Sequence, residues 1–150
     1  MNKIGAMVLS DETIADLPNK CGGCMIGWFK ITGRLPGYNQ VISKTRASKY
    51  EGARLKQEAE SQIGWAIRRA MKEGHLEKVR VPVKIRFTWH ESTSRRDLDN
   101  IFSAKKFILD ALQKMWVLDG DGQKYVKGLS DEFVLDKVEE FIMVELEEAN

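Results

Sequence analysis

The sequence contains few of the residues that build disulfide frameworks or zinc sites. It has two cysteines, Cys21 and Cys24, and two histidines, His75 and His90. Two cysteines cannot form a disulfide framework. Zinc normally takes four ligands, and neither histidine has a second ligand near it in the sequence. A reduced Cys pair in a loop is therefore favoured over a zinc or redox site, although completion of a site across a dimer stays open.

Long apolar runs are also missing. No stretch approaches the roughly 20 apolar residues that span a bilayer, and no signal-peptide pattern opens the chain. We therefore expect a cytoplasmic protein with no membrane partner. The chain of 150 residues has no internal repeat and is long enough for one domain with its own core. We predict an N-terminal extension over residues 1–25 and a single domain over residues 26–150.

The charge is small in sum but uneven along the chain. The formal net charge is +2, yet Lys and Arg outnumber Asp and Glu over residues 1–106, and the reverse holds over residues 107–150. A basic body with an acidic C-terminal segment is compatible with a polyanionic partner that binds on one face. The alternative, which explains the charge pattern equally well, is a solvent-exposed surface whose charges are unevenly distributed but bind no partner.

Apolar periodicity predicts the first half of the fold. Alternation over residues 28–35 predicts a strand, and a turn follows at 36–39. A helical apolar stripe then runs from about residue 43 to residue 71, and Gly74 is placed to end that helix. These patterns place a strand and one long helix before the middle of the chain.

The second half alternates in the same way. Strict alternation over residues 79–89 predicts a half-buried strand whose outer face is basic and includes Arg86. Pro82 cannot donate a ladder hydrogen bond, which predicts an edge position or a bulge. Two short strands are expected around Gly128, and a last strand over residues 138–146. The predicted class is α/β (α+β), a single compact domain with a mixed β-sheet packed by two main helices.

Three basic residues, Lys44, Arg46 and Lys49, precede or open the long predicted helix. Cations do not stabilise a helix N-terminus, which already carries partial positive charge. They would serve an anion such as a phosphate group there. An exposed, solubilising flank is the alternative.

An acidic motif lies at residues 95–100, which read Arg-Arg-Asp-Leu-Asp-Asn. The carboxylates of Asp97 and Asp99 are close in sequence and would repel each other unless a cation neutralises them. Hard oxygen ligands suit Mg²⁺, with Mn²⁺ as a substitute. Arg95 and Arg96 would then bind backbone phosphates. The competing interpretation is that the acids cap the helix that follows them.

That next helix is predicted to extend to about Met115. On it, Lys106 lies nearly two turns beyond Asp99 on the same face, so the spacing favours Lys106 over Lys105 as a site residue. A further acidic turn follows the helix, where Asp121 could join the first two acids if a strand brings the chain back. Asp119 is the alternative third acid.

The combined motifs resemble the RusA-type Holliday junction resolvases of bacteria and their prophages. The resemblance spans about residues 28–146, and the segments that carry it are 30–39, 95–100, 104–112, 118–121 and 128–133. It has no counterpart for the first 25 residues, and the helix after Asp99 is longer than the family pattern.

The resemblance implies a compact homodimer that cuts four-way DNA junctions by paired, metal-dependent nicks in recombination and repair. By motif position, catalysis would be carried by Asp97, Asp99, Asp121 and Lys106, with the three aspartates as metal ligands. The DNA-binding residues that we predict are Arg95, Arg96, Lys44, Arg46, Lys49 and Arg86. A non-catalytic DNA-binding module and a metal-dependent phosphatase acting on small molecules are the alternative functions.

Overall fold

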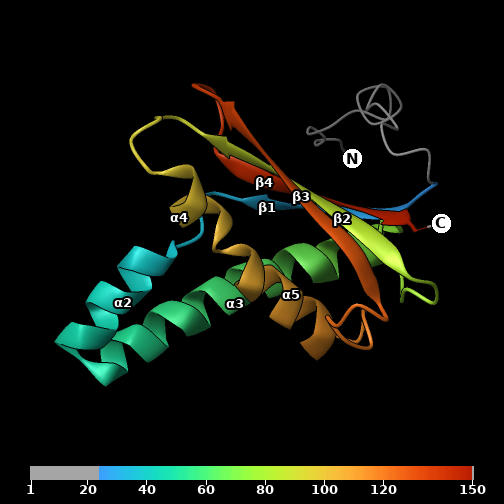
Figure 1. Ribbon diagram of the computed structural model, residues 1–150, viewed down its shortest axis with the longest axis horizontal. Coiled ribbons are helices and arrows are strands. Elements are labelled where there is room, and N and C mark those ends of the chain that lie inside the picture. The colour runs from blue at the N-terminus through green and yellow to red at the C-terminus, as the bar shows by residue number, and fades with distance from the viewer. Residues whose placement is uncertain (1–23, 150) are drawn as a thin grey trace.

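The structure is a computed structural model that describes residues 24–149. Figure 1 shows a β-sheet that lies over a layer of helices. In chain order the elements are β1 (Met25–Thr32), α2 (Tyr38–Ala47), α3 (Lys49–Glu73), β2 (Val83–Glu91), α4 (Leu98–Phe102), α5 (Lys105–Lys114), β3 (Val126–Leu135) and β4 (Phe141–Glu148). The described residues form one α+β domain. Residues 1–23, which include Cys21 and most of the predicted extension, lie outside the described part.

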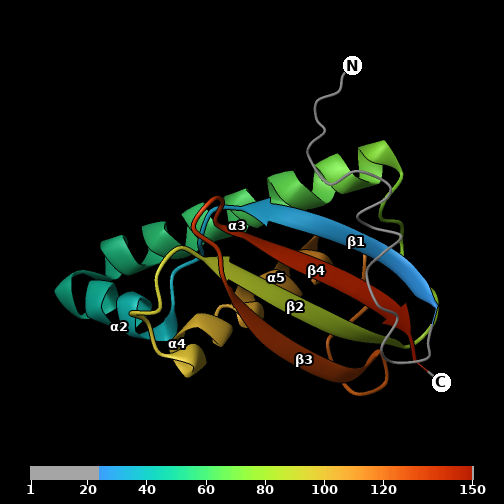
Figure 2. The same ribbon diagram turned by 90° about the horizontal axis from the view of Figure 1, so that it is seen from above.

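The four strands form one mixed sheet in the order β1-β4-β2-β3 (Figure 2). β4 pairs antiparallel with both β1 and β2, whereas β2 and β3 are parallel. A parallel pair needs a crossover connection, and α4 and α5 supply it between β2 and β3. The prediction of a mixed sheet is confirmed.

The core lies between this sheet and the helices α3 and α5. Alternate residues of the strands, such as Phe29, Phe87 and Val144, are fully buried, and they meet Ile63 of α3 and Ile108 of α5 in one apolar cluster. The predicted period of two along the strands and the helical stripes therefore point to the same core. Two helices, α3 and α5, therefore pack on the sheet. The second predicted helix, expected to extend to about Met115, is divided into α4 and α5 by a turn at Ser103 and Ala104.

The long helix predicted over residues 43–71 is in fact two helices. Ser48 is extended (φ −168°, ψ 132°) and separates α2 from α3, while its side-chain oxygen accepts a hydrogen bond from the backbone N–H of Glu51. Gly52 lets the helices approach, because a Cβ there would lie 2.2 Å from the side-chain oxygen of Thr45. The predicted stop at Gly74 is confirmed, with φ +84° in the left-handed region.

Several predicted strand boundaries were wrong. β2 is an interior strand between β4 and β3, so Pro82 does not mark an edge. It lies just before the strand begins, and the register of β2 with β3 shifts between the next two residues, Val83 and Lys84, as the alternative prediction of a bulge expects. The two short strands expected around Gly128 are one continuous strand, β3, because it pairs with β2 along its whole length. The last strand begins at Phe141, and Val138 is almost fully exposed before it. β1 ends at Thr32, where Gly33 turns the chain with φ +85°.

Candidate functional site

The segment that carries Asp97 and Asp99 is held against the start of α2. Gly37, the residue before α2, offers no side-chain cap, and a Cβ there would lie 2.4 Å from Asn100. Instead, the side chain of Asn100 accepts from the backbone N–H of Asn39 at 3.0 Å, and the hydroxyl of Ser103 accepts from that of Tyr38 at 2.9 Å. These bonds satisfy N–H groups that the first turn of a helix leaves unpaired. They also fix the position of α4.

The carboxylates of Asp97 and Asp99 are exposed. Asp97 stands at the N-cap position of α4 with extended backbone (φ −67°, ψ 144°), but its side chain makes no capping hydrogen bond. Within residues 24–149 neither carboxylate has a hydrogen bond or an ion pair, and Asp99 lies in the first turn of α4. Their backbone carbonyls do accept hydrogen bonds, that of Asp97 from the N–H groups of Asn100 and Ile101 and that of Asp99 from the N–H of Ser103. The acids therefore do not cap α4 through side-chain hydrogen bonds, although their charges lie at its N-terminus, where the helix dipole favours them.

The two arginines before the acids differ in their surroundings. Arg96 donates from its guanidinium to both carboxylate oxygens of Glu91, one of them at 3.2 Å, and to the carbonyl of Leu35 at 3.3 Å. Glu91 is buried, so this pair lies largely inside the protein. Arg95 is exposed and has no ion pair to any described residue. Of the two arginines in this motif, Arg95 is thus the one whose guanidinium is available.

The loop between β2 and α4 is attached to the start of β4. The backbone N–H and the hydroxyl of Ser92 donate to one carboxylate oxygen of Glu140, at 2.9 and 2.8 Å. These two hydrogen bonds hold the pKa of Glu140 below its ordinary value. Lys137 also donates to the carbonyl of Ser92 at 2.9 Å. The acidic motif therefore begins from a fixed loop.

Lys106, the predicted site lysine, lies against two carboxylates. Its ammonium is 3.0 Å from Asp110 on the next turn of α5 and 3.3 Å from Asp121 in the turn after the helix. The hydrogen bond and the charge of Asp110, followed by the hydrogen bond of Asp121, raise the pKa of Lys106. The lysine therefore stays protonated. It lies beside Asp121, but within residues 24–149 no hydrogen bond or ion pair joins it to Asp99, with which it was expected to share a helix face.

The two alternative residues have partners of their own. Lys105 bonds to Asp131 of β3, whose other oxygen accepts from the indole N–H of Trp89 at 3.0 Å. Asp119 bonds to Lys78. Lys105 is more enclosed than Lys106, with 25% of its side chain exposed against 66%. The geometry thus groups Lys106 with Asp121, and it separates Lys105 and Asp119 from them.

No three carboxylate, imidazole or thiol groups of residues 24–149 lie close enough together to form a metal-holding cluster. Asp97, Asp99 and Asp121 are therefore not gathered into a closed three-ligand site in this conformation. Asp121 is directed to Lys106, while the oxygens of Asp97 and Asp99 have no partner among the described residues. The donor chemistry suits Mg²⁺ or Mn²⁺, since all available ligands are hard oxygens.

The remaining basic residues lie in places that the sequence did not predict. Lys44 and Arg46 are in the last turn of α2, not before a helix N-terminus, and there the partial negative charge of the helix end favours cations. The prediction of a basic helix N-terminus was wrong for these two, because the helix breaks at Ser48. Lys49 opens α3, and all three side chains are exposed. Arg86 is only 13% exposed and pairs with glutamates of β4.

Sequence reasoning missed Asp110, Asp131 and the Ser48 break. Asp110 had a visible signal, because it lies four residues after Lys106 on one helix. Ser48 and Glu51 have the spacing of a capping box, which marks a helix start. Asp131 had none, since only the parallel pairing of β3 with β2 brings it near Lys105 and Trp89.

Comparison with models of known protein families and with curated proteins gives no match for this chain. None of the described helices combines the length and the apolar character that crossing a membrane requires.

Proposed function

We propose that this protein is a Mg²⁺-dependent, structure-selective endodeoxyribonuclease that resolves Holliday junctions by paired phosphodiester cleavage. The observation that carries the proposal is the exposed acidic pair at the start of α4. Asp97 and Asp99 have no side-chain partner in the described chain, so both carboxylates are available to a cation. The motif resemblance adds the reaction class.

Asp97 and Asp99 would hold the metal ion, with Asp121 as the third ligand. Their unpartnered oxygens fit a hard divalent cation. When bound, such an ion lowers the pKa of a water molecule and neutralises charge on the oxygens of the phosphodiester. Asp121 would have to share its charge between the ion and Lys106, whose ammonium lies 3.3 Å away.

The protein's own cations would position the DNA. Lys106 stays protonated and can stabilise negative charge that develops on the phosphate. Arg95 is free to contact a backbone phosphate, as are the exposed side chains of Lys44, Arg46 and Lys49. Arg86 and Arg96 contribute less directly, because glutamates already occupy their guanidinium groups.

We further propose that two copies act together. A four-way junction has two-fold symmetric strands, and paired nicks need two symmetry-related sites, which a homodimer supplies. Size-exclusion chromatography with light scattering would test this directly. A monomer at concentrations at which junctions are cut in pairs would contradict it.

The deciding experiment compares a synthetic four-way junction, a linear duplex of the same sequence and a small phosphate ester, each with Mg²⁺ and with EDTA. We expect cleavage only of the junction and only with Mg²⁺. Asp97→Asn and Asp99→Asn should abolish cleavage while junction binding is retained. Cleavage that persists in both variants would refute the proposal, and turnover of the ester alone would indicate a phosphatase.

A non-catalytic DNA-binding module is the second candidate. It rests on the exposed cations Arg95, Lys44, Arg46 and Lys49, which could contact backbone phosphates whether or not a metal ion is bound. Such a module would bind the junction equally well with Mg²⁺ and with EDTA and would never nick it. The same assay therefore separates the two functions.

A further inference from the structure

Figure 2 shows β1 at the edge of the sheet opposite to β3, with α3 next to it. A groove of about 640 Å³ is lined by residues of β1 and α3. We call it the β1–α3 groove. Its lining includes Lys30 and Thr32 of β1 and Gln62, Trp65, Arg68, Arg69 and Lys72 of α3. Its volume falls within the range of about 300–1,000 Å³ that is usual for ligand sites. Neither Asp97 nor Asp121 lines it.

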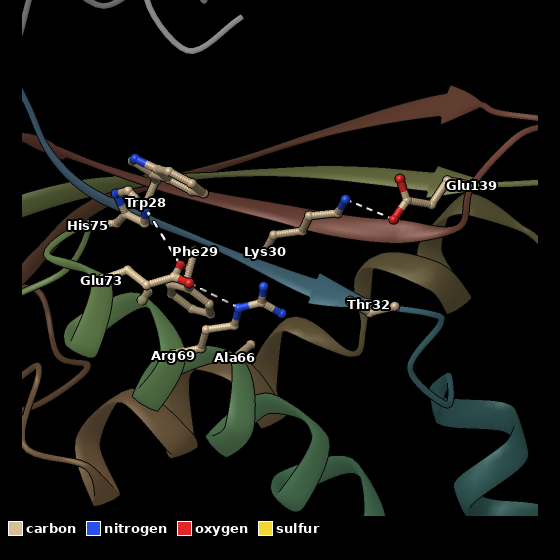
Figure 3. Close-up of a pocket in the computed structure, with 10 residues that line it drawn as sticks. Trp28, Phe29, Lys30, Thr32, Ala66, Arg69, Glu73, His75 and Glu139 are labelled. Carbon is tan, nitrogen blue, oxygen red and sulfur yellow. Dashed lines mark hydrogen bonds and ion pairs between the residues drawn. The ribbon is translucent and has the colours of Figure 1, made fainter. Parts of the chain in front are cut away.

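The groove carries positive charge without internal compensation. Four cations line it and no carboxylate does. Two of the cations are partly neutralised by carboxylates that line a neighbouring pocket (Figure 3). Lys30 lies 2.8 Å from Glu139, and Arg69 lies 3.3 Å from Glu73. Arg68 and Lys72 have no ion pair to any residue of the described chain. The groove is therefore complementary to a polyanion.

An aromatic side chain lies beside these cations. Trp65 is 69% exposed, so most of its indole surface is accessible to a ligand. The guanidinium of Arg68 lies 5.9 Å from the centre of its ring. Trp65 and Arg68 also line a second hollow on the α5 side. The indole thus stands between two depressions, with space on both sides.

The groove is attached to a rigid part of the fold. The amide of Gln62 donates to the carbonyl of Thr32 at 2.6 Å and to that of Arg34 at 3.3 Å, which ties the end of β1 to α3. Ala66 of α3 also lines the groove, and Ala70, one turn further on, is buried in the core. A ligand would therefore meet preformed walls, and binding would require little ordering of the protein.

We propose that the β1–α3 groove binds a single DNA strand, with a base stacked on Trp65 and backbone phosphates held by Arg68 and Lys72. An exposed aromatic ring among cations is the arrangement that single-stranded nucleic acids use, because every base offers a flat face beside a charged phosphate. An acidic peptide would engage the cations but would leave the indole without a matching group. The choice of DNA as the strand rests on the proposed function, and the groove gives the protein a second contact on a branched substrate.

Binding should be measured by fluorescence anisotropy in EDTA, so that no cleavage is required. The probes are a labelled oligothymidylate and an abasic strand of equal length. Trp65→Ala is expected to weaken oligothymidylate binding by about 5- to 150-fold and to leave abasic-strand binding unchanged. The double variant Arg68→Ala/Lys72→Ala should weaken both probes and reduce the salt slope by about 0.7 for each lost phosphate contact.

Matched controls exist in the same chain. Trp116 is 73% exposed and lies outside the groove, so Trp116→Ala controls for the loss of an exposed indole. Lys56→Ala/Arg80→Ala removes the same charge from exposed residues elsewhere. Both controls should bind the two probes as the unmodified protein does. Circular dichroism and thermal unfolding of each variant verify that the fold is retained.

Three results would overturn the proposal. The first is unchanged strand binding in the groove variants, and the second is an equal loss in groove and control variants. The third is displacement of the strand by a polyglutamate peptide at equal charge concentration. Failure of this proposal can be told apart from failure of the proposed function. If the protein cuts junctions and the groove variants bind the single strand as well as the unmodified protein does, only the groove proposal is rejected. Strand binding that depends on Trp65 in a protein that never cuts rejects only the nuclease.

Discussion

Replacing Arg96 by alanine would leave the carboxylate of Glu91 in the protein interior without its main cation. The exposed fraction of Glu91 is 3%, and Arg96 donates to both of its oxygens. Removing one partner of a buried ion pair typically costs about 3–5 kcal/mol. Arg34 lies 3.9 Å from Glu91 and compensates in part. We therefore expect the lower end, a loss of about 3 kcal/mol in the free energy of unfolding.

Urea denaturation measures this loss, and calorimetry should show a melting temperature lower by roughly 6–12 °C for a chain of this size. Arg95→Ala is the matched control, because the neighbouring side chain is exposed and unpaired, and its stability should change by less than about 0.5 kcal/mol. The double variant Arg96→Met/Glu91→Leu should recover most of the lost stability, since an apolar pair replaces the ion pair.

For DNA binding we expect the opposite ranking, with a larger loss of affinity in Arg95→Ala than in Arg96→Ala. Arg95→Ala should lower the salt slope of junction binding by about 0.9, the value for one lost phosphate contact on duplex DNA. The reasoning would be refuted if Arg96→Ala were as stable as the unmodified protein and lost as much DNA affinity as Arg95→Ala. That result would mean that Arg96 leaves Glu91 to bind DNA.

Other residues give three further predictions. Lys106→Ala should abolish junction cleavage with little change in stability, whereas Lys105→Ala should lower the melting temperature and reduce cleavage less; the opposite ranking would contradict the site assignment. Trp116 has φ +62° immediately after α5, so Trp116→Gly should raise the free energy of unfolding by up to about 1 kcal/mol, and a loss in urea titrations would count against backbone strain. Burial raises the pKa of Glu145, so the folded state holds this proton more tightly than the unfolded chain. The stability that this group contributes is therefore present below the ordinary carboxyl pKa and is lost as the pH rises through the raised pKa. The melting temperature of the unmodified protein should fall over this pH range, and Glu145→Gln should reduce that fall.

Local patterns in the sequence were sufficient for several of the elements. Alternation placed the buried residues of β2, and Gly74 ended α3 where a left-handed residue was expected. These predictions succeeded because each depends on residues that are near one another along the chain or on a simple period. The argument that Lys106 shares a helix face with Asp99 assumed one continuous helix, whereas the chain breaks between α4 and α5, so the role of Lys106 stays a prediction.

The sequence by itself therefore determined an α+β domain with a mixed sheet, two packing helices and an acidic motif between β2 and α4. Only the tertiary structure decided that β2 is an interior strand, that Arg96 is bound to Glu91 and that Lys105 meets Asp131. Only it placed Lys30 of β1 beside Trp65 of α3. The reason is that strand order and ion-pair partners depend on which distant segments share a sheet, and no local period encodes that choice.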